Sequence, residues 1–224
     1  MASSYCADAS STTTTLHSAT TLLLQINDGY TSFACNFLRH YYALRIPNMS
    51  LLAITHGRAS YDSVRALATG ADDRVVLAAA GGGGDDANAF SKWNQPSFNS
   101  LVFDKLQRLV DELRLRPNRP VLYTDLDTVW RSNPLVHVAR AAATAVAAHP
   151  SQQRKKSFWV VKEDAFHYCM GFFVACPSAA TIALLREWRE AVAKTRRAGA
   201  LANDQEIFQQ LMLQNESGGL RSLL

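Results

Sequence analysis

Residues 121–130 read Val-Leu-Tyr-Thr-Asp-Leu-Asp-Thr-Val-Trp, and this stretch decides the class of the fold. Its first four residues are apolar or β-prone, so they predict a buried strand that ends where Asp125 begins. Asp125 and Asp127 are two positions apart, and in an extended chain such positions project to the same side. Both carboxylates can therefore face one Mg²⁺ or Mn²⁺ ion, which also accepts water and phosphate oxygens. A pair that only caps the following turn is the structural alternative.

Segments on both sides of this strand alternate between strand and helix. Short apolar runs predict the strands, and apolar residues three and four positions apart predict the helices. Such alternation is typical of an α/β fold with a mostly parallel central sheet flanked by helices. We expect strands over 22–26, 49–54, 74–79, 157–162 and 171–176, and helices over 33–44, 61–68, 102–113 and 178–197. Thr31 or Ser32 can cap the first of these helices.

The composition excludes several classes of protein. A chain of 224 residues with 48% hydrophobic and 19% charged residues has the make-up of one globular domain. Because it contains no apolar run of about 18 residues, we expect no membrane span in this chain. The net charge is only +4, and the basic clusters at 154–156 and 194–197 lack interleaved aromatic residues, so we expect no nucleic-acid partner.

Two chemistries fit an Asp-x-Asp pair after a buried strand. A phosphohydrolase of the haloacid dehalogenase type would use Asp125 as a nucleophile and Asp127 as a general acid beside Mg²⁺. That enzyme needs a further acidic pair downstream, whereas the pairs at 72–73 and 85–86 lie upstream. Sugar transfer from a nucleoside diphosphate instead uses the metal to neutralise charge that develops on the diphosphate. The flanking segments favour sugar transfer.

Five segments, in order, resemble the nucleotide-diphospho-sugar transferase domain of glycosyltransferase family 77. They are residues 22–30, Phe103-Asp104-Lys105-Leu106, residues 121–135, Gly171-Phe172-Phe173-Val174 and residues 203–208. The resemblance implies a GT-A-type fold and transfer of a hexosyl or pentosyl group, with retention, to a glycan or glycoprotein hydroxyl. It also implies a nucleotide-sugar donor, UDP-linked in preference to GDP-linked, with Mn²⁺ or Mg²⁺ as cofactor. A non-catalytic relative that keeps the fold and binds a partner is the second alternative.

The resemblance assigns roles to individual residues. Asp127 would be the direct metal ligand, while Asp125 would hold the donor ribose or a metal-bound water beside it. Asp204 and Gln205 would act as the catalytic pair beside the sugar. The remaining donor-binding residues would be Asn27, Tyr30, Lys105 and Asp164.

Structural alternatives exist for three of these residues. Lys105 lies off the centre of its helical face, so it is either an exposed lysine or a donor contact. Asp204 and Gln205 follow Asn203, a good helix N-cap, and an acid is favoured in the first turn of any helix. They either serve that helix or contact the sugar. One departure from the family pattern is Cys169-Met170, where relatives commonly have Asn with Ser or Thr.

We expect residues 1–20 to be a disordered Ser/Thr-rich leader and 21–224 to form a single glycosyltransferase domain. That domain would end before the C-terminal segment with which relatives close the donor site. The four glycines and two aspartates within 80–90 predict a flexible loop, with a phosphate cradle as the alternative. Alanine favours a helix over 141–148, whereas the family has a strand there. The resemblance implies a Golgi enzyme with an N-terminal anchor. Because we identify neither an anchor nor a clear signal peptide in this chain, a soluble, cytoplasmic location is the alternative.

Overall fold

The computed structural model describes residues 19–78, 96–148, 157–162, 167–198 and 203–214. Within them, strands alternate with helices from β1 to β5, as the sequence predicts, and β6 follows β5 directly. The strands are β1 (Thr20–Ile26), β2 (Met49–Thr55), β3 (Arg74–Leu77), β4 (Val121–Thr124), β5 (Phe158–Lys162) and β6 (Tyr168–Ala175). The helices are the short η1 (Asp28–Tyr30), then α1 (Thr31–Ala43), α2 (Arg58–Leu67), α3 (Pro96–Leu115), α4 (Pro134–Ala148), α5 (Ala179–Arg197) and α6 (Asp204–Gln214).

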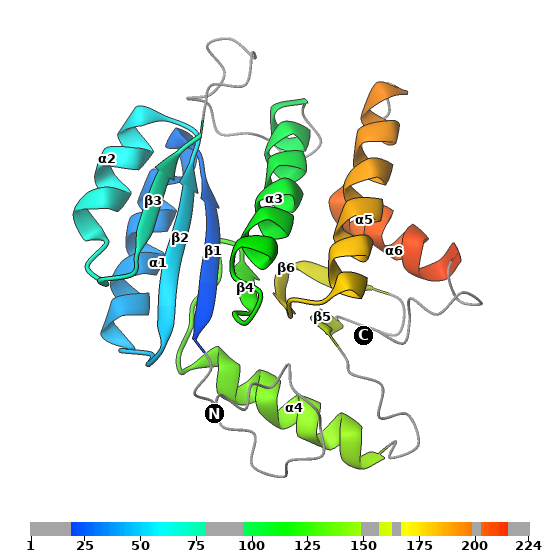
Figure 1. Cartoon of the computed structure of the whole chain (residues 1–224). Helices are drawn as coiled ribbons and strands as arrows, with labels where there is room; N and C mark the ends of the chain where they lie inside the picture. The colour runs from blue at the N-terminus through cyan, green and yellow to red at the C-terminus, as the bar shows by residue number, and fades with distance from the viewer. Residues whose placement is uncertain (1–18, 79–95, 149–156, 163–166, 199–202, 215–224) are drawn as a thin grey trace.

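The strands form one sheet in the order β3-β2-β1-β4-β6-β5 (Figure 1). β3, β2, β1 and β4 are mutually parallel. β6 pairs antiparallel with both of its neighbours, so β5 runs in the same direction as the first four strands. The prediction of a mostly parallel sheet is therefore confirmed. Parallel neighbours end at the same edge, and this property brings the ends of β1, β2 and β4 together.

Helices cover both faces of the sheet. Successive strand residues point to opposite faces, so Leu22 and Leu24 pack in one core while Leu23 packs in the other. The first core receives side chains from α1, α2 and the start of α4; the second receives them from α3, α5 and α6. Figure 1 shows α1 and α2 on one side of the sheet and α3, α5 and α6 on the other, with α4 lying across its foot. Strands buried on both faces explain their nearly continuous apolar sequences.

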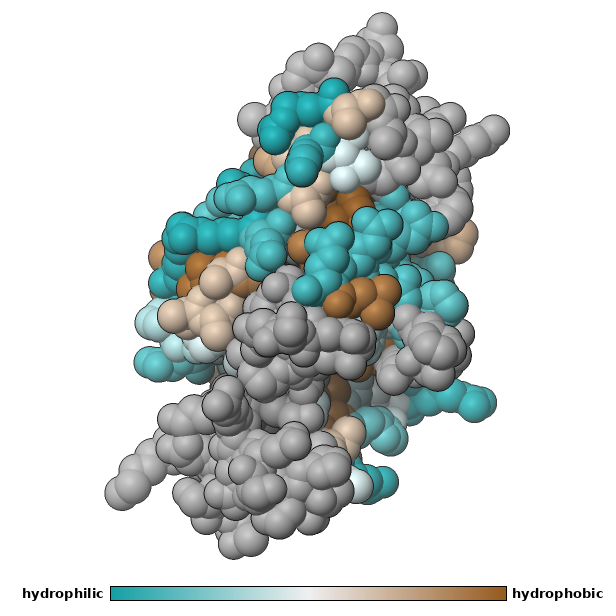
Figure 2. All heavy atoms as spheres, turned by 90° about the vertical axis from the view of Figure 1, so that its right-hand side faces the viewer, coloured by the Kyte–Doolittle hydropathy of each residue, from teal (hydrophilic) through white to brown (hydrophobic). Residues whose placement is uncertain are grey.

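The outer surface over α5 and α6 is mostly hydrophilic, with scattered hydrophobic atoms among the described residues (Figure 2). α5 shows how the sequence produces this surface. Its residues Leu184, Leu185 and Trp188 are fully buried at three- and four-residue spacing, and charged residues occupy the opposite face. Within the described residues, no helix has both the length and the apolarity needed to cross a membrane.

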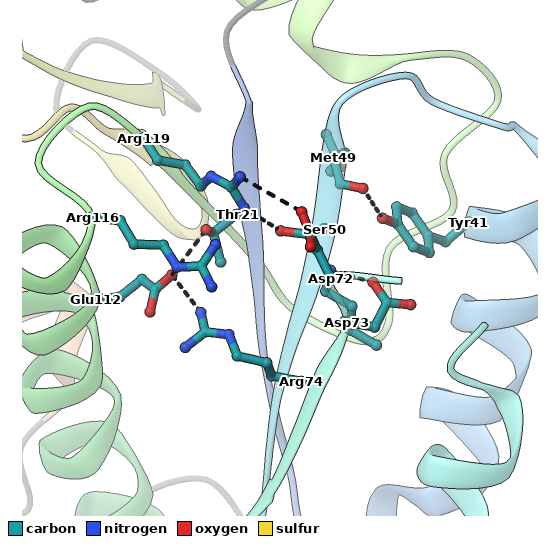
Figure 3. Close-up of polar contacts among 11 residues, drawn as sticks. Thr21, Tyr41, Met49, Ser50, Asp72, Asp73, Arg74, Glu112, Arg116 and Arg119 are labelled. Carbon is teal, nitrogen blue, oxygen red and sulfur yellow. Dashed lines mark hydrogen bonds and ion pairs between the residues drawn. The ribbon is translucent and has the colours of Figure 1, made fainter. Parts of the chain in front are cut away.

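A cluster of polar side chains lies at the edge of the sheet where β1, β2 and β3 begin (Figure 3). Glu112 of α3 is 3% exposed, and one of its carboxylate oxygens accepts hydrogen bonds from Thr21 Oγ1, at 3.0 Å, and from the Arg74 guanidinium. We call this group the amino-edge cluster. Its members are Thr21, Ser50, Asp72, Asp73, Arg74, Glu112, Arg116 and Arg119.

Local expectations needed three corrections. Residues 141–148 belong to helix α4, so alanine propensity prevails and the strand expected from the family is wrong. β6 begins at Tyr168, three residues before the predicted Gly171, which places Cys169 and Met170 inside the strand. Thr31 does not cap α1, because its Oγ1 donates to the Asp28 carbonyl oxygen within the preceding turn. The expected leader, the glycine-rich loop and Asp164 lie outside the described residues.

Candidate active site

A cavity of about 370 Å³ opens where β1 and β4 end, between the sheet, α3 and the start of α6. Crevices at the carboxyl ends of strands are the usual ligand sites of open α/β sheets. Seven of the eight residues that the sequence singled out line this cavity; the eighth, Asp164, is outside the described residues. Those seven are Asn27, Tyr30, Lys105, Asp125, Asp127, Asp204 and Gln205.

Asp125 is held in place from three directions. Its backbone N–H donates to the Gly171 carbonyl oxygen at 2.8 Å, and Tyr123 Oη donates to its Oδ1 at 2.8 Å. Thr128 Oγ1 donates to its carbonyl oxygen at 2.8 Å, which closes the turn after β4. A Cβ atom on Gly171 would lie 2.5 Å from Asp125 Oδ2, so glycine is required there for the carboxylate to fit. The carboxylate is therefore preorganised in the cavity wall.

Burial and neighbouring acids raise the pKa of the Asp125 carboxyl group. Burial raises its pKa above the usual range, and the negative charges of Asp204 and Asp127 add to that increase. The Lys105 ammonium and the Tyr123 hydrogen bond act in the opposite direction without cancelling it. The side chain still reaches the solvent of the cavity. A cation bound from that side would favour the ionised form.

Asp127 is exposed and lies at the same edge. Its charge reaches Tyr30, whose phenol has a raised pKa because of burial first and the charges of Asp127 and Asp125 second. The η1 turn carries Tyr30 to this position, since Asn27 Oδ1 accepts the Tyr30 N–H at 3.2 Å. Asn27 and Tyr30 thus meet the Asp-x-Asp pair although about 100 residues separate them along the chain.

Lys105 and Asp204 form a buried ion pair. Their Nζ and Oδ2 atoms are 2.7 Å apart, and the two side chains are only 5% and 10% exposed. The ammonium also lies 4.5 Å from the centre of the Tyr123 ring and 5.8 Å from that of Trp188. The exposed-lysine alternative is therefore wrong. Asp204 occupies the first turn of α6, and Trp188 Nε1 donates to its carbonyl oxygen at 3.0 Å, so its position serves both the helix and the cavity.

Asn203 caps α6, because its Oδ1 accepts the Gln205 N–H at 2.9 Å. Gln205 Oε1 lies 3.5 Å from the Met170 backbone nitrogen, which is a long contact for a hydrogen bond. The cap turns Gln205 toward β6 and into the cavity wall. Met170 is 2% exposed and also lines the cavity, so the departure from the family pattern falls within the site.

Sequence reasoning missed two polar residues of the cavity, Gln25 and Tyr123. The sequence pattern identifies Tyr123 only as a residue of a buried strand, although its hydroxyl contacts Asp125. Gln25 interrupts an apolar run, and a polar residue inside a buried strand was the available signal. Both lie within one or two residues of a strand end, where side chains surface at the cavity.

The charges around the cavity are unbalanced. Among the described residues that line it, three carboxylates, Asp125, Asp127 and Asp204, face one cation, Lys105. No three His, Cys, Asp or Glu side chains of the described residues converge to hold a metal ion by themselves. Two carboxylates at the Asp-x-Asp pair nevertheless fit Mg²⁺ or Mn²⁺, which usually take one or two carboxylates and complete their coordination with water and substrate phosphates. The donor set fits a cation that binds together with a phosphate ligand.

Comparison with known protein families gives the cavity its context. A family model described as nucleotide-diphospho-sugar transferase matches residues 58–221, which is well over half of the chain. The chain belongs to the nucleotide-diphospho-sugar transferase family. The match includes the Asp-x-Asp pair, Lys105, Asp204 and Gln205, and it begins after β2. No curated protein sequence matches the chain. Membership of family 77 stays a prediction.

Proposed function

We propose that this chain is a metal-dependent glycosyltransferase that moves a sugar from a nucleoside diphosphate to a hydroxyl acceptor. The observation that carries the proposal is the acidic surplus of the cavity. Among the described residues that line the cavity, three carboxylates and one ammonium give a formal charge of −2. A nucleotide-sugar diphosphate is itself an anion, and like charges a few ångströms apart repel strongly in a partly buried site. A divalent cation offsets that repulsion, and the Asp-x-Asp pair is where it would be held.

We assign a role to each residue from its position in the cavity. Asp127 and Asp125 would hold Mn²⁺ or Mg²⁺, and the bound cation would neutralise charge that develops on the diphosphate. Tyr123 fixes the Asp125 carboxylate through its 2.8 Å hydrogen bond. Lys105 holds Asp204 in the wall, so that Asp204 and Gln205 present polar atoms to the donor sugar. These fixed dipoles and charges need no reorganisation when the reaction begins.

Retention follows if the acceptor hydroxyl attacks from the side of the leaving group. The departing phosphate oxygen can then take the proton of the acceptor, and no protein base is required. Two features of the site support this scheme. The described lining residues include no His or Glu, and Asp204 is already paired with Lys105. We further propose a UDP-sugar donor, hexosyl or pentosyl, and a glycan or glycoprotein acceptor; these choices and the Golgi location rest on the family resemblance.

Calorimetric titration of the purified chain with UDP and GDP, each with and without Mn²⁺, tests the proposal. We expect one nucleotide to bind only when Mn²⁺ is present, and the Asp127→Asn variant to lose that binding. Asp111→Asn is the matched control, because Asp111 is an exposed acid of α3 that accepts a hydrogen bond from Gln107 and does not line the cavity.

Each outcome has a clear meaning. Binding followed by release of UDP or GDP from the matching nucleotide sugar supports a transferase. Mn²⁺-dependent binding without any turnover indicates a non-catalytic relative. Equal binding by wild type and Asp127→Asn, or release of inorganic phosphate from a phosphate ester, contradicts the proposal.

A further inference from the structure

Gln25, near the end of β1, lies in the cavity wall and is held through its amide nitrogen. Its Nε2 donates to the Leu101 carbonyl oxygen at 2.7 Å and lies 3.0 Å from His56 Nε2. A reversed amide would place Oε1 against the Leu101 oxygen, and two acceptors without a proton between them repel. The amide therefore has one stable orientation, with its nitrogen toward α3 and β2.

This orientation determines the state of His56. Because Gln25 Nε2 can only donate, His56 Nε2 must accept, and the imidazole is neutral with its proton on Nδ1. Two observations agree with this assignment. Burial lowers the pKa of His56, an effect that Arg108 reinforces and Asp104 opposes. Asp104 Oδ2 lies 3.6 Å from the same nitrogen yet has no hydrogen-bond partner, whereas a protonated Nε2 would donate to it.

The remaining acceptor of the amide is Gln25 Oε1. Both hydrogens of Nε2 are used, and Oε1 makes no hydrogen bond with any described residue. The side chain is half-buried and borders the cavity. A ligand in the cavity that offers an N–H or O–H group at this point would find a fixed acceptor, and leaving that acceptor unpaired would cost affinity.

The order of the strands indicates which part of the ligand reaches Gln25. β1 lies on one side of β4, and β6 with α6 lies on the other. The Asp-x-Asp pair follows β4, so a diphosphate held there has Asp204 and Gln205 on the α6 side. If the sugar takes that side, the nucleoside takes the side of β1.

We propose that Gln25 is a specificity-determining residue that accepts a hydrogen bond from the nucleoside of the donor, from a base N–H or a ribose hydroxyl. His56 is its positioning residue. The inference rests on the proposed function and extends it, since it assigns a residue to the recognition of the nucleoside. The family model begins at residue 58, so neither side chain lies in the matched segment.

Calorimetry with Mn²⁺ and whichever of UDP or GDP binds tests the role of Gln25. We expect Gln25→Leu to weaken binding about tenfold, the effect of one buried hydrogen bond. Gln107→Leu, on the exposed face of α3, is the matched control and should leave the affinity unchanged. Nucleotide analogues with an N-methylated base, a 2′-deoxyribose or a 3′-deoxyribose then identify the group that Gln25 contacts. The analogue that lacks this group should bind wild type more weakly than the parent nucleotide does. In Gln25→Leu, the same analogue and the parent nucleotide should bind equally.

His56 variants test the positioning role separately. His56→Phe should weaken binding in wild type and have no further effect in Gln25→Leu, while His56→Gln, whose side-chain oxygen can accept, should restore affinity. If wild type binds a nucleotide and Gln25→Leu binds it with the same affinity, the role of Gln25 is overturned while the proposed function stands. Additive effects of His56→Phe and Gln25→Leu overturn the positioning role. Failure of wild type to bind either nucleotide contradicts the proposed function instead.

Discussion

Charged side chains gather at both edges of the central sheet, and the two groups differ in how fully their charges are paired. At the amino-edge cluster, the buried Glu112 carboxylate meets Arg74 and lies 3.4 Å from the Arg116 guanidinium. At the carboxyl edge, Asp125 and Asp127 share a cavity with Lys105, which is the one basic side chain among the described lining residues and forms its ion pair with Asp204. A polar cluster that the chain completes stabilises the fold, whereas one that it leaves incomplete is available to a ligand.

Removing a charge from the carboxyl edge should affect ligand binding much more than stability. Asp127→Asn should lower Mn²⁺-dependent nucleotide affinity by about a hundredfold or more, because the cation loses a charged ligand. The free energy of unfolding should change by no more than about 0.5 kcal/mol, since the side chain is exposed. Calorimetry and urea unfolding measure the two effects. A large loss of stability would show that Asp127 belongs to the structural framework.

The reverse pattern is expected at the completed edge. Glu112→Gln keeps the shape of the side chain but removes the charge that Arg74 and Arg116 face, and should destabilise the fold by about 2 to 3 kcal/mol. Nucleotide affinity of the folded variant should be unchanged. Glu190→Gln, on the exposed face of α5, is the control for urea unfolding. Altered nucleotide affinity in Glu112→Gln would mean that the two edges are coupled.

Two glycines allow the same perturbation at both edges. A Cβ on Gly171 would lie 2.5 Å from Asp125 Oδ2, and one on Gly70 would lie 2.6 Å from Asp73 Oδ1. Gly171→Ala should therefore weaken Mn²⁺-dependent nucleotide binding about tenfold, with no added effect in an Asp125→Ala background. Gly70→Ala should lower stability by about 1 to 2 kcal/mol and leave binding intact. Equal affinities of wild type and Gly171→Ala for the nucleotide would show that the position of the Asp125 carboxylate does not matter for binding.

The smallest expected effect is the change in the free energy of unfolding when Asp125 can no longer ionise. Its pKa is raised in the folded state, so the fold binds this proton more tightly than the unfolded chain and loses stability as pH rises above the usual carboxyl range. Asp125→Asn should then be slightly more stable than wild type at pH 7, by less than about 1 kcal/mol. The difference should shrink as pH falls toward about 4, where the unfolded carboxyl is also protonated. Urea unfolding at several pH values measures it; a variant less stable than wild type at pH 7 contradicts it.

Local pattern was sufficient for most of the fold. The apolar run before Asp125 and the spacing of Leu184, Leu185 and Trp188 each report burial directly, because they reflect the period of one strand or helix. Two of the expectations needed correction for different reasons. In residues 141–148 alanine propensity gave the right answer and the family pattern did not, and at Thr31 an earlier turn claimed the hydroxyl that was expected to cap α1.

The sequence by itself determined the parallel α/β class and the placement of two carboxylates at the end of β4, because both follow from neighbouring residues. Only the tertiary structure decided that Lys105 pairs with Asp204, 99 positions away, and that His56 holds the Gln25 amide across 31 positions. These partners meet because of the strand order and the helix packing, which the period of a single segment does not encode. The charge of the cavity and the orientation of its acceptors are therefore properties of the assembled sheet.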